Sequence, residues 1–195
     1  MSAIVLPFRE DLPSIAEATW LPLPMVDRDE LTMLRGAGVS EYMLRDVKAF
    51  ACTFFLANFF ELAQIPGDGE RCFIVPIRDA REEVIDLAAW PITNPRHLAR
   101  WSGTGSMLGE GLVGNPATFA YGQALPVFRS ALTWLQHEAR GIVIIDMPTA
   151  ARKLADAPAL VGEDAAHAIQ LSRDLAPRVG KDRIYAPRPD RQGAA

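Results

Sequence analysis

Residues 71–90 place two β-rich apolar runs on either side of a short charged bend, and they constrain the fold more than any other stretch. This pattern predicts a β-hairpin. The first run is apolar at successive positions, which indicates a strand that is buried on both faces. Pro76 lies within this run, and because proline has no backbone N–H, it predicts a bulge or an edge position there.

Helical signals precede the hairpin. Residues 1–26 contain four prolines and predict an irregular arm with one short helix near Ser14. Asp27 followed by Glu30 has the spacing of a helix capping box. Ser40 is a candidate cap for a second helix. Apolar residues follow it at helical spacing: Met43, Leu44, Val47 and Phe50.

Residues 54–60, Phe-Phe-Leu-Ala-Asn-Phe-Phe, form the most aromatic run of the chain. Its periodicity fits either a buried strand or a buried helix segment. Two roles remain open for these side chains. They belong to the core, or they form an exposed apolar surface through which chains associate.

The second half of the chain alternates helical and strand signals. One helix is predicted from Pro95 to Trp101, with Arg96 and Arg100 on a common face, and another from Ser130 to Arg140. Residues 142–145 predict a strand, residues 149–157 a helix that Pro148 begins, and residues 163–176 a last helix. Residues 183–186 predict an edge strand.

These signals predict an α+β fold with three parts. They are a helical N-terminal segment, a central β-hairpin in a small mixed sheet, and a short C-terminal α/β unit. A chain of 195 residues fits one domain, predicted at 27–177, between the arm of residues 1–26 and a tail at 178–195.

The distribution of charge limits the classes of partner. The net charge is −4, but residues 178–191 carry five basic and two acidic side chains, so the rest of the chain is more acidic still. An acidic body argues against broad nonspecific nucleic-acid binding, although it leaves room for a small basic groove.

The compartment is predicted to be the cytoplasm. Cys52 and Cys72 stand apart in the sequence, which indicates buried thiols in a reducing environment. The N-terminus lacks the basic region of a signal peptide. No apolar run approaches the roughly 20 residues that a membrane-spanning helix needs.

Chemical motifs are sparse, and the sequence predicts no catalytic residue, no metal site and no cofactor. Residues 109–114 match the letters of a dinucleotide-binding Gly-x-Gly-x-x-Gly, but Asn115-Pro116 blocks the helix that such a site needs. The three histidines, His97, His137 and His167, lack the spacing of metal ligands.

Two carboxylates are candidate functional residues. Asp146 ends an apolar strand and begins a helix, so it is either a helix cap or a site residue that works with a divalent cation. Asp79 lies in the hairpin bend between two arginines, where a turn-forming and ion-paired role is expected.

Several segments in order resemble the catalytic core of bacterial replicative DNA primases. They are Leu34-Arg-Gly-Ala-Gly-Val-Ser40, the Ile-Val-Pro-Ile-Arg-Asp of residues 74–79, Asn115-Pro-Ala-Thr118, and Phe128-Arg129. Residues 141–146 resemble the first strand of that family's toprim subdomain. The resemblance covers roughly residues 31–155, and it implies a replication-related fold.

The chain departs from the primase pattern at the catalytic positions. The family's toprim strand ends in Glu-Gly, where this chain has Asp146-Met147, and the metal-binding Asp-x-Asp of the family is absent after residue 146. A two-metal site needs several converging carboxylates. The resemblance therefore implies a truncated, catalytically inactive core of phage or mobile-element origin.

Three functional hypotheses follow. The first is a non-enzymatic accessory protein that binds single-stranded DNA or a replication protein, with the predicted contacts Arg78, Arg96, Arg100 and Arg129. The second is a protein-interaction or assembly component that uses residues 54–60 and has no nucleic-acid role. The third is an enzyme that uses Asp146 with a divalent cation.

Overall fold

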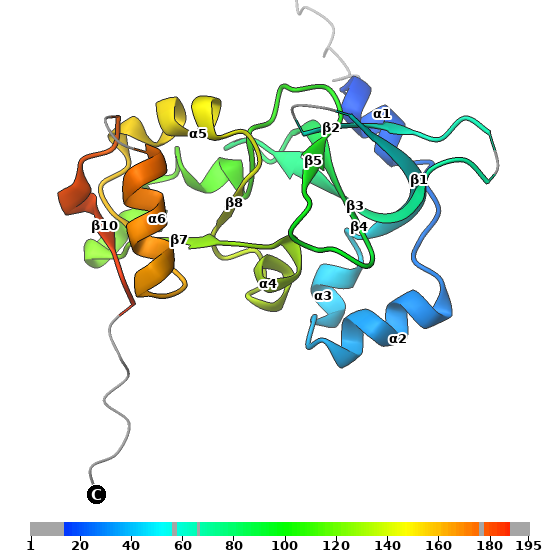
Figure 1. Ribbon diagram of the computed structural model, residues 1–195, viewed down its shortest axis with the longest axis horizontal. Coiled ribbons are helices and arrows are strands. Elements are labelled where there is room, and N and C mark those ends of the chain that lie inside the picture. Colours follow the sequence, from blue (N-terminus) through cyan, green and yellow to red (C-terminus); the bar gives the residue numbers. More distant parts are fainter. Residues whose placement is uncertain (1–13, 56–57, 66, 176–177, 188–195) are drawn as a thin grey trace, which may run out of the picture.

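A closed five-stranded β-barrel and a second five-stranded sheet lie side by side (Figure 1). The computed structural model describes residues 14–55, 58–65, 67–175 and 178–187, so the first half of the predicted arm and the end of the predicted tail lie outside the described residues. The predicted α+β class is confirmed. None of the described helices has the length and apolar character needed to cross a membrane.

The barrel half comprises, in chain order, α1 (Ile15–Trp20), α2 (Arg28–Gly36), α3 (Glu41–Leu44), β1 (Lys48–Phe55), β2 (Phe59–Leu62), β3 (Glu70–Arg78), β4 (Val84–Pro91) and β5 (Ala99–Arg100). The barrel order is β1-β2-β5-β4-β3, and β3 closes it by pairing with β1. Helices α2 and α3 lie below the barrel in Figure 1.

The second half comprises β6 (Met107–Leu108), η1 (Glu110–Leu112), η2 (Pro116–Gly122), β7 (Leu125–Phe128), α4 (Ala131–Gln136), β8 (Ile142–Ile144), α5 (Met147–Lys153), η3 (Leu154–Asp156), β9 (Leu160–Gly162), α6 (Ala165–Leu175), η4 (Lys181–Arg183) and β10 (Ile184–Tyr185). Its sheet has the order β10-β9-β7-β8-β6. The predicted edge strand near residue 184 is confirmed, because β10 ends the sheet.

The predicted hairpin is strands β3 and β4, which pair antiparallel from Cys72–Pro91 to Arg78–Val84. The register shifts between Ile77 and Arg78, beside Pro76. Pairing of β3 with β1 ends at Ile74, so Pro76 lies beyond it and is paired only with β4. Because no residue of β1 pairs with Pro76, the missing N–H of proline costs no hydrogen bond to β1.

The second predicted helix is much shorter than expected. α3 ends at Leu44, and the Ser40 side chain makes no cap hydrogen bond to it. Val47 follows the helix as buried coil, and Phe50 belongs to strand β1. The prediction was wrong there because β1 pairs on both sides, with β2 and β3, and this tertiary pairing outweighs a helical spacing of apolar residues.

The predicted helix from Pro95 to Trp101 is also wrong. This segment is a turn followed by the short strand β5, in which Arg100 pairs with Ala88 of β4 and with Phe59 of β2. Arg96 is exposed and Arg100 is buried, so the two do not share a solvent-facing helix surface.

The N-terminal capping signals are confirmed. Ser14 caps α1, and Trp20 at its end is buried against the barrel. Asp27 and Glu30 form the capping box of α2. Glu30 also accepts a hydrogen bond from Arg71 Nε at 2.6 Å, which ties α2 to β3. One carboxylate thus caps the start of a helix and joins this helix to the barrel.

The second sheet is built from parallel strands whose crossover helices lie on opposite faces. Strands β10, β9, β7 and β8 are parallel, and β6 is antiparallel to β8. The chain passes from β7 to β8 on one side and then returns to β9 on the other side of β7. The direction of winding therefore reverses between β7 and β9, and in open α/β sheets ligands bind at such a point.

Three apolar clusters form the core. One fills the barrel beneath α1 and includes the predicted buried thiols, Cys52 and Cys72. One lies between the outer face of β3–β4 and helices α2 to α4. The third lies between the second sheet and helices α5 and α6.

The aromatic run of residues 54–60 spans the end of β1 and the start of β2. Phe60 is fully buried, whereas Phe54 and Phe59 are half-buried and Phe55 is half-exposed. Residues 56 and 57 lie outside the described part of the chain. The run contributes to the barrel core, and association through it stays a prediction.

Glu30→Ala should lower the free energy of unfolding by about 2 kcal/mol, because it removes half of the capping box and the partner of Arg71. Glu30→Gln, which keeps an oxygen acceptor, should cost about half as much. Urea unfolding followed by circular dichroism measures both. The exposed Glu61→Gln serves as control, and an equal effect of all three variants would contradict the assigned role of Glu30.

Candidate functional site: an acidic cavity between the two halves

A cavity of about 210 Å³ lies where the β3–β4 turn meets α4 and the loop after β6. Four segments far apart in the sequence supply its walls. The lining residues are Tyr42, Met43, Asp46, Val75, Pro76, Arg78, Asp79, Ala80, Glu82, Gly109, Gly111, Leu112, Asn115, Trp134, Leu135, Glu138 and Ala139.

The apolar part of the cavity wall is rigid. Met43, Val75, Trp134 and Leu135 are all buried members of the cluster between the barrel and α4. Trp134 Nε1 donates a hydrogen bond to the carbonyl oxygen of Gly141 at 2.8 Å, which fixes the orientation of the indole ring. Side chains packed in this way keep the cavity preformed.

The charged part of the wall is predominantly acidic. It contains the carboxylates Asp46, Asp79, Glu82 and Glu138 and one cation, Arg78. Arg78 Nη1 donates to the Glu82 carbonyl oxygen at 3.0 Å, and its Nη2 lies 3.9 Å from Asp46 Oδ1. Glu138 also pairs with Arg140, which is not part of the wall, at 2.7 Å. The four carboxylates still outnumber these two cations, so the cavity favours a positively charged group.

The backbone around the cavity adopts unusual conformations. Glu82, Glu138 and Ala139 have φ values of 63°, 53° and 58°, in the left-handed region that non-glycine residues seldom occupy. At Gly111 a Cβ atom would lie 2.4 Å from the Asp79 carbonyl oxygen, so the loop after β6 must approach the hairpin turn closely. Such conformations concentrate at functional sites.

Asp79 has the expected turn-forming role. Its Oδ1 accepts hydrogen bonds from the backbone N–H groups of Arg81 and Glu83, at 2.8 and 3.1 Å. Sequence reasoning therefore found this carboxylate but missed its place in a cavity. The sequence around Asp79 gives no sign of the cavity, because other walls of the cavity come from α3 and α4, which are distant in the sequence.

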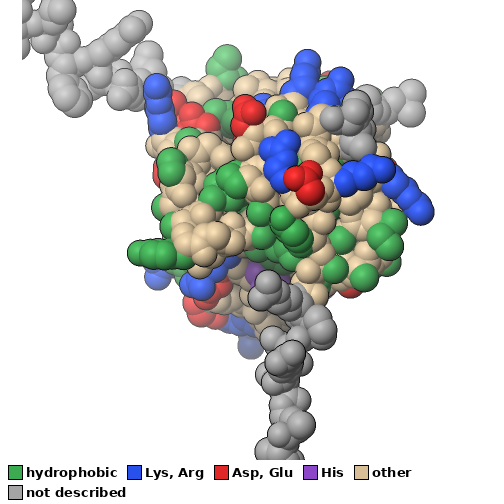
Figure 2. All heavy atoms as spheres, turned by 90° about the vertical axis from the view of Figure 1, so that its left-hand side faces the viewer, with side chains coloured by type: hydrophobic (Ala, Val, Ile, Leu, Met, Phe, Trp, Pro, Cys, Tyr) green, Lys and Arg blue, Asp and Glu red, His purple; other side chains and the backbone are tan. Residues whose placement is uncertain are grey.

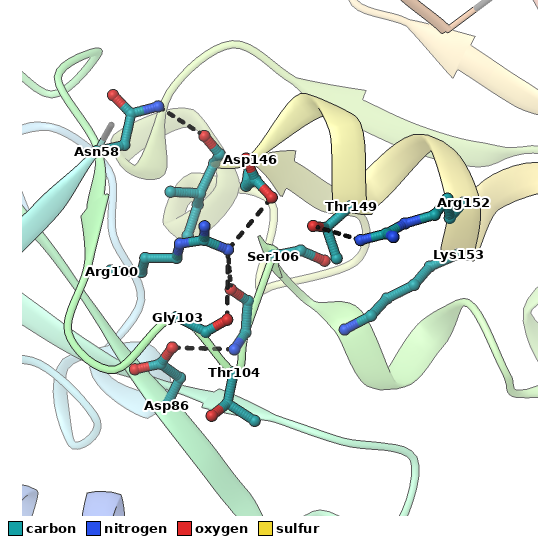
Figure 3. A network of polar contacts seen from close by, with 12 residues as sticks. Asn58, Asp86, Arg100, Gly103, Thr104, Ser106, Asp146, Thr149, Arg152 and Lys153 are labelled. Atoms are coloured by element: carbon teal, nitrogen blue, oxygen red, sulfur yellow. Dashed lines mark hydrogen bonds and ion pairs between the residues drawn. The ribbon is translucent and has the colours of Figure 1, made fainter. Parts of the chain in front are cut away.

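A second polar cluster joins the barrel to the second sheet (Figure 3). Arg100 Nη1 donates to the Gly105 carbonyl oxygen at 3.1 Å and lies 3.4 Å from Asp146 Oδ2. Asn58 donates to the Ile145 carbonyl oxygen at 2.8 Å across the same joint. The cluster connects β5 and the β1–β2 turn to the end of β8.

Asp146 occupies the N-cap position of α5, but its side chain makes no cap hydrogen bond. The carboxylate pairs with Arg100 instead. Pro148 in the first turn needs no N–H acceptor, which leaves the Asp146 side chain available for this pair. Within the described residues, no group of three or more His, Cys, Asp or Glu side chains could hold a metal ion.

Asp86 fixes the backbone of the loop at residues 102–105, to which Arg100 donates a hydrogen bond. It is fully buried, and its Oδ1 accepts from the N–H groups of Leu87 and Ser102, both at 2.8 Å. Its Oδ2 accepts from the Gly105 N–H at 2.9 Å. A carboxylate with three backbone donors is well satisfied without solvent, so its role is structural.

Arg129 lies at the winding reversal between β7 and β9. Its guanidinium contacts Glu163 Oε2 at 3.0 Å and Asp164 Oδ2 at 2.7 Å. The hydrogen bonds that Arg129 donates to the Asp164 carboxylate raise the pKa of Arg129. The same ion pair holds the pKa of the Asp164 carboxyl well below its usual range. The charge of Arg129 is thus used to hold the start of α6 against β7.

The four arginines predicted to bind nucleic acid lie in different environments. Arg78 faces the acidic cavity, and it pairs with Val84 on β4, whereas Arg100 pairs with Ala88 four residues further along that strand. Arg100 and Arg129 each contact carboxylates. Of the four, only Arg96 is exposed, in the turn before β5.

Comparison with known proteins adds no family assignment: no family model matches the chain, and no curated protein or solved structure matches it.

Asp86→Ala should lower the free energy of unfolding by about 3 kcal/mol, because three backbone N–H groups around a buried position lose their acceptor. Asp86→Asn, which retains one oxygen, should cost about 1–2 kcal/mol. Urea unfolding measures both changes. Asp68→Asn on an exposed turn is the control, and a loss for Asp86→Ala no larger than the control would contradict the role of the carboxylate.

Stability should fall as the pH drops below neutrality because of His167. Burial, followed by the charge of Arg129, lowers the pKa of His167, whose Nδ1 accepts a hydrogen bond from the Glu163 N–H. The unfolded chain therefore binds more protons than the folded chain once the pH falls below about 6.5, the ordinary pKa of histidine. This stability is present above pH 6.5 and is lost as the pH approaches the lowered folded-state pKa.

The urea midpoint of the wild-type protein should be lower at pH 5.5 than at pH 7.5. His167→Asn places an amide oxygen near the position of Nδ1 and removes the titrating group, so its midpoint should depend less on pH over this interval. An equal pH dependence of the two proteins would show that other groups dominate.

Proposed function

We propose that this protein is a non-enzymatic binding protein whose acidic cavity accepts the cationic side chain of a partner protein. The observation that carries the proposal is the presence, in one preformed cavity, of four carboxylates and a single arginine above an apolar aromatic wall. Lysine and arginine side chains combine an apolar stem with a charged end, which matches this arrangement.

The cavity contributes two kinds of contact to such a ligand. Trp134 and Tyr42 offer aromatic surface to a cation, and Asp46 and Glu138 offer carboxylate oxygens. The volume of about 210 Å³ is below the range of about 300–1,000 Å³ that is usual for small-molecule sites. A single long side chain therefore suits the cavity better than a nucleotide.

Single-stranded DNA, the partner implied by the primase resemblance, has less support as a ligand. Arg100 and Arg129 each have carboxylate partners, and Arg78 lies among the acidic groups of the cavity. Phosphate binding needs cations that can release counterions on contact. The primase relationship and a replication role stay predictions.

Titration of the isotope-labelled protein with N-acetyl-arginine amide tests the proposal. Backbone amide shifts should be confined to residues 42–46, 78–82, 109–115 and 134–139, which line the cavity. N-acetyl-glutamate amide, of similar size and opposite charge, should produce none. The expected dissociation constant is on the order of 1 mM, because the probe makes few contacts.

The double variant Asp46→Asn, Glu138→Gln should weaken binding of the arginine probe about tenfold, which equals about 1.4 kcal/mol. The pair Glu61→Gln, Asp68→Asn, on exposed positions away from the cavity, should bind it as the wild type does. Equal binding of both probes, or an unchanged affinity of the cavity variant, would overturn the proposal. So would salt-dependent binding of oligodeoxythymidine without any response to the arginine probe.

A further inference from the structure

One face of the second sheet is only partly covered. Helices α5 and α6 pack on the face that carries Leu125, Leu160 and Ile184. On the opposite face, α4 covers the end of β7 and β8. Among the described residues, no helix covers β9 and β10 on that side, because α4 is the only crossover helix there. Parallel strands are usually covered on both faces.

The uncovered strands carry a row of side chains in register. Pro126 of β7 pairs with Val161 of β9, which pairs with Tyr185 of β10. Pro126 and Val161 are half-buried, and Tyr185 is 50% exposed. Figure 2 views the molecule from the α6 and β10 end and shows hydrophobic side chains gathered among separate Lys and Arg side chains.

This row forms the floor of a long groove. Two adjoining cavities of about 860 and 1,040 Å³ share Pro126, Arg140, Val161 and Pro187 as walls, so they make one continuous groove along the strands. One end reaches Gly162 and Glu163, at the winding reversal between β7 and β9. That is the position at which open α/β sheets bind ligands.

The exposed hydrogen-bond donors of the groove belong to Arg140. Its guanidinium is largely exposed and carries several N–H groups, and the residue lines both cavities. Ser40 and Thr118 line the two ends of the groove, but their hydroxyl oxygens are inaccessible to solvent and do not face a ligand.

The charges of the groove are balanced. Arg140 pairs with Glu138 at 2.7 Å, and Glu163 pairs with Arg129 at 3.0 Å. Its aromatic surface comes from Tyr185 and from His137, which stacks on Phe128 with ring centroids 4.9 Å apart. The groove therefore suits an uncharged, extended ligand that offers hydrogen-bond acceptors.

We infer that this groove binds an extended, proline-rich segment of a partner protein. A proline-rich chain keeps its carbonyl acceptors but lacks N–H donors, which complements the exposed N–H groups of Arg140. Its preformed extended helix docks on shallow aromatic surfaces at low entropic cost. The groove and the acidic cavity meet at the turn after α4, where Glu138 lines both, and at Leu112, and their other lining residues differ.

Fluorescein-labelled decaproline is the probe, and a glycine-serine peptide of equal length is the control. Decaproline should bind measurably tighter by fluorescence anisotropy, and amide shifts should fall on residues 126–128, 137–140, 160–162 and 184–187. Tyr185→Ala and Arg140→Ala change exposed side chains and should each weaken binding about fivefold or more. Tyr121→Ala, at a fully exposed position outside the groove, should leave the affinity unchanged.

Equal binding of the two peptides would overturn the inference, as would full affinity in a folded Tyr185→Ala, Arg140→Ala double variant. Sedimentation of the free protein supplies a further test. A dimer that Tyr185→Ala dissociates, together with no decaproline binding, would assign the groove to a second copy of the chain and overturn the inference. The arginine probe of the acidic cavity should bind the Tyr185→Ala variant normally, because Tyr185 lines only the groove, so the two proposals fail independently. Arg140→Ala does not serve this comparison, because Arg140 pairs with Glu138, which also lines the acidic cavity.

Discussion

The β3–β4 hairpin is buried on both faces, and the rest of the molecule depends on this. Alternate residues of each strand point into different cores: Ile74 and Leu87 into the barrel, and Phe73 and Trp90 toward helices α2 to α4. Large aromatic side chains of this kind bury about 150–250 Å² each. The hairpin is therefore the shared wall of the molecule, and neither core can form without it.

The joint between the barrel and the second sheet is polar at one end and apolar at the other. At the polar end, Asp86 holds the loop that receives Arg100, and Arg100 reaches across to Asp146. Removal of one partner from such a pair leaves a buried charge without compensation. Arg100, predicted to contact nucleic acid, is thus explained by the architecture alone.

Local signals predicted the elements that local interactions stabilise. The capping box of Asp27 and Glu30, the Ser130 cap of α4 and the hairpin all depend on residues close together in the chain. Strand β1 was predicted as part of a helix because its apolar spacing fits both structures, and pairing with β2 and β3 decides between them. The spacing of apolar residues along the sequence does not report such contacts between distant strands.

The candidate sites were less accessible to prediction than the fold, for the same reason. Asp79 and Arg78 were both singled out, but the cavity also needs Trp134 and Glu138, more than 50 residues further along the chain. The groove depends on the register of Pro126, Val161 and Tyr185 across three strands. Neither site has a motif, because each is assembled by topology from ordinary residues.

The shared hairpin wall has a consequence for synthesis of the chain on the ribosome. Strands β3 and β4 emerge long before residues 131–145, which supply α4 and β8 to cover Phe73 and Trp90. Since domains form from the N-terminus during translation, the barrel and helices α2 and α3 can assemble while the part of the outer face that α4 and β8 complete still lies open to water. During that interval the nascent chain exposes apolar surface that the finished protein buries.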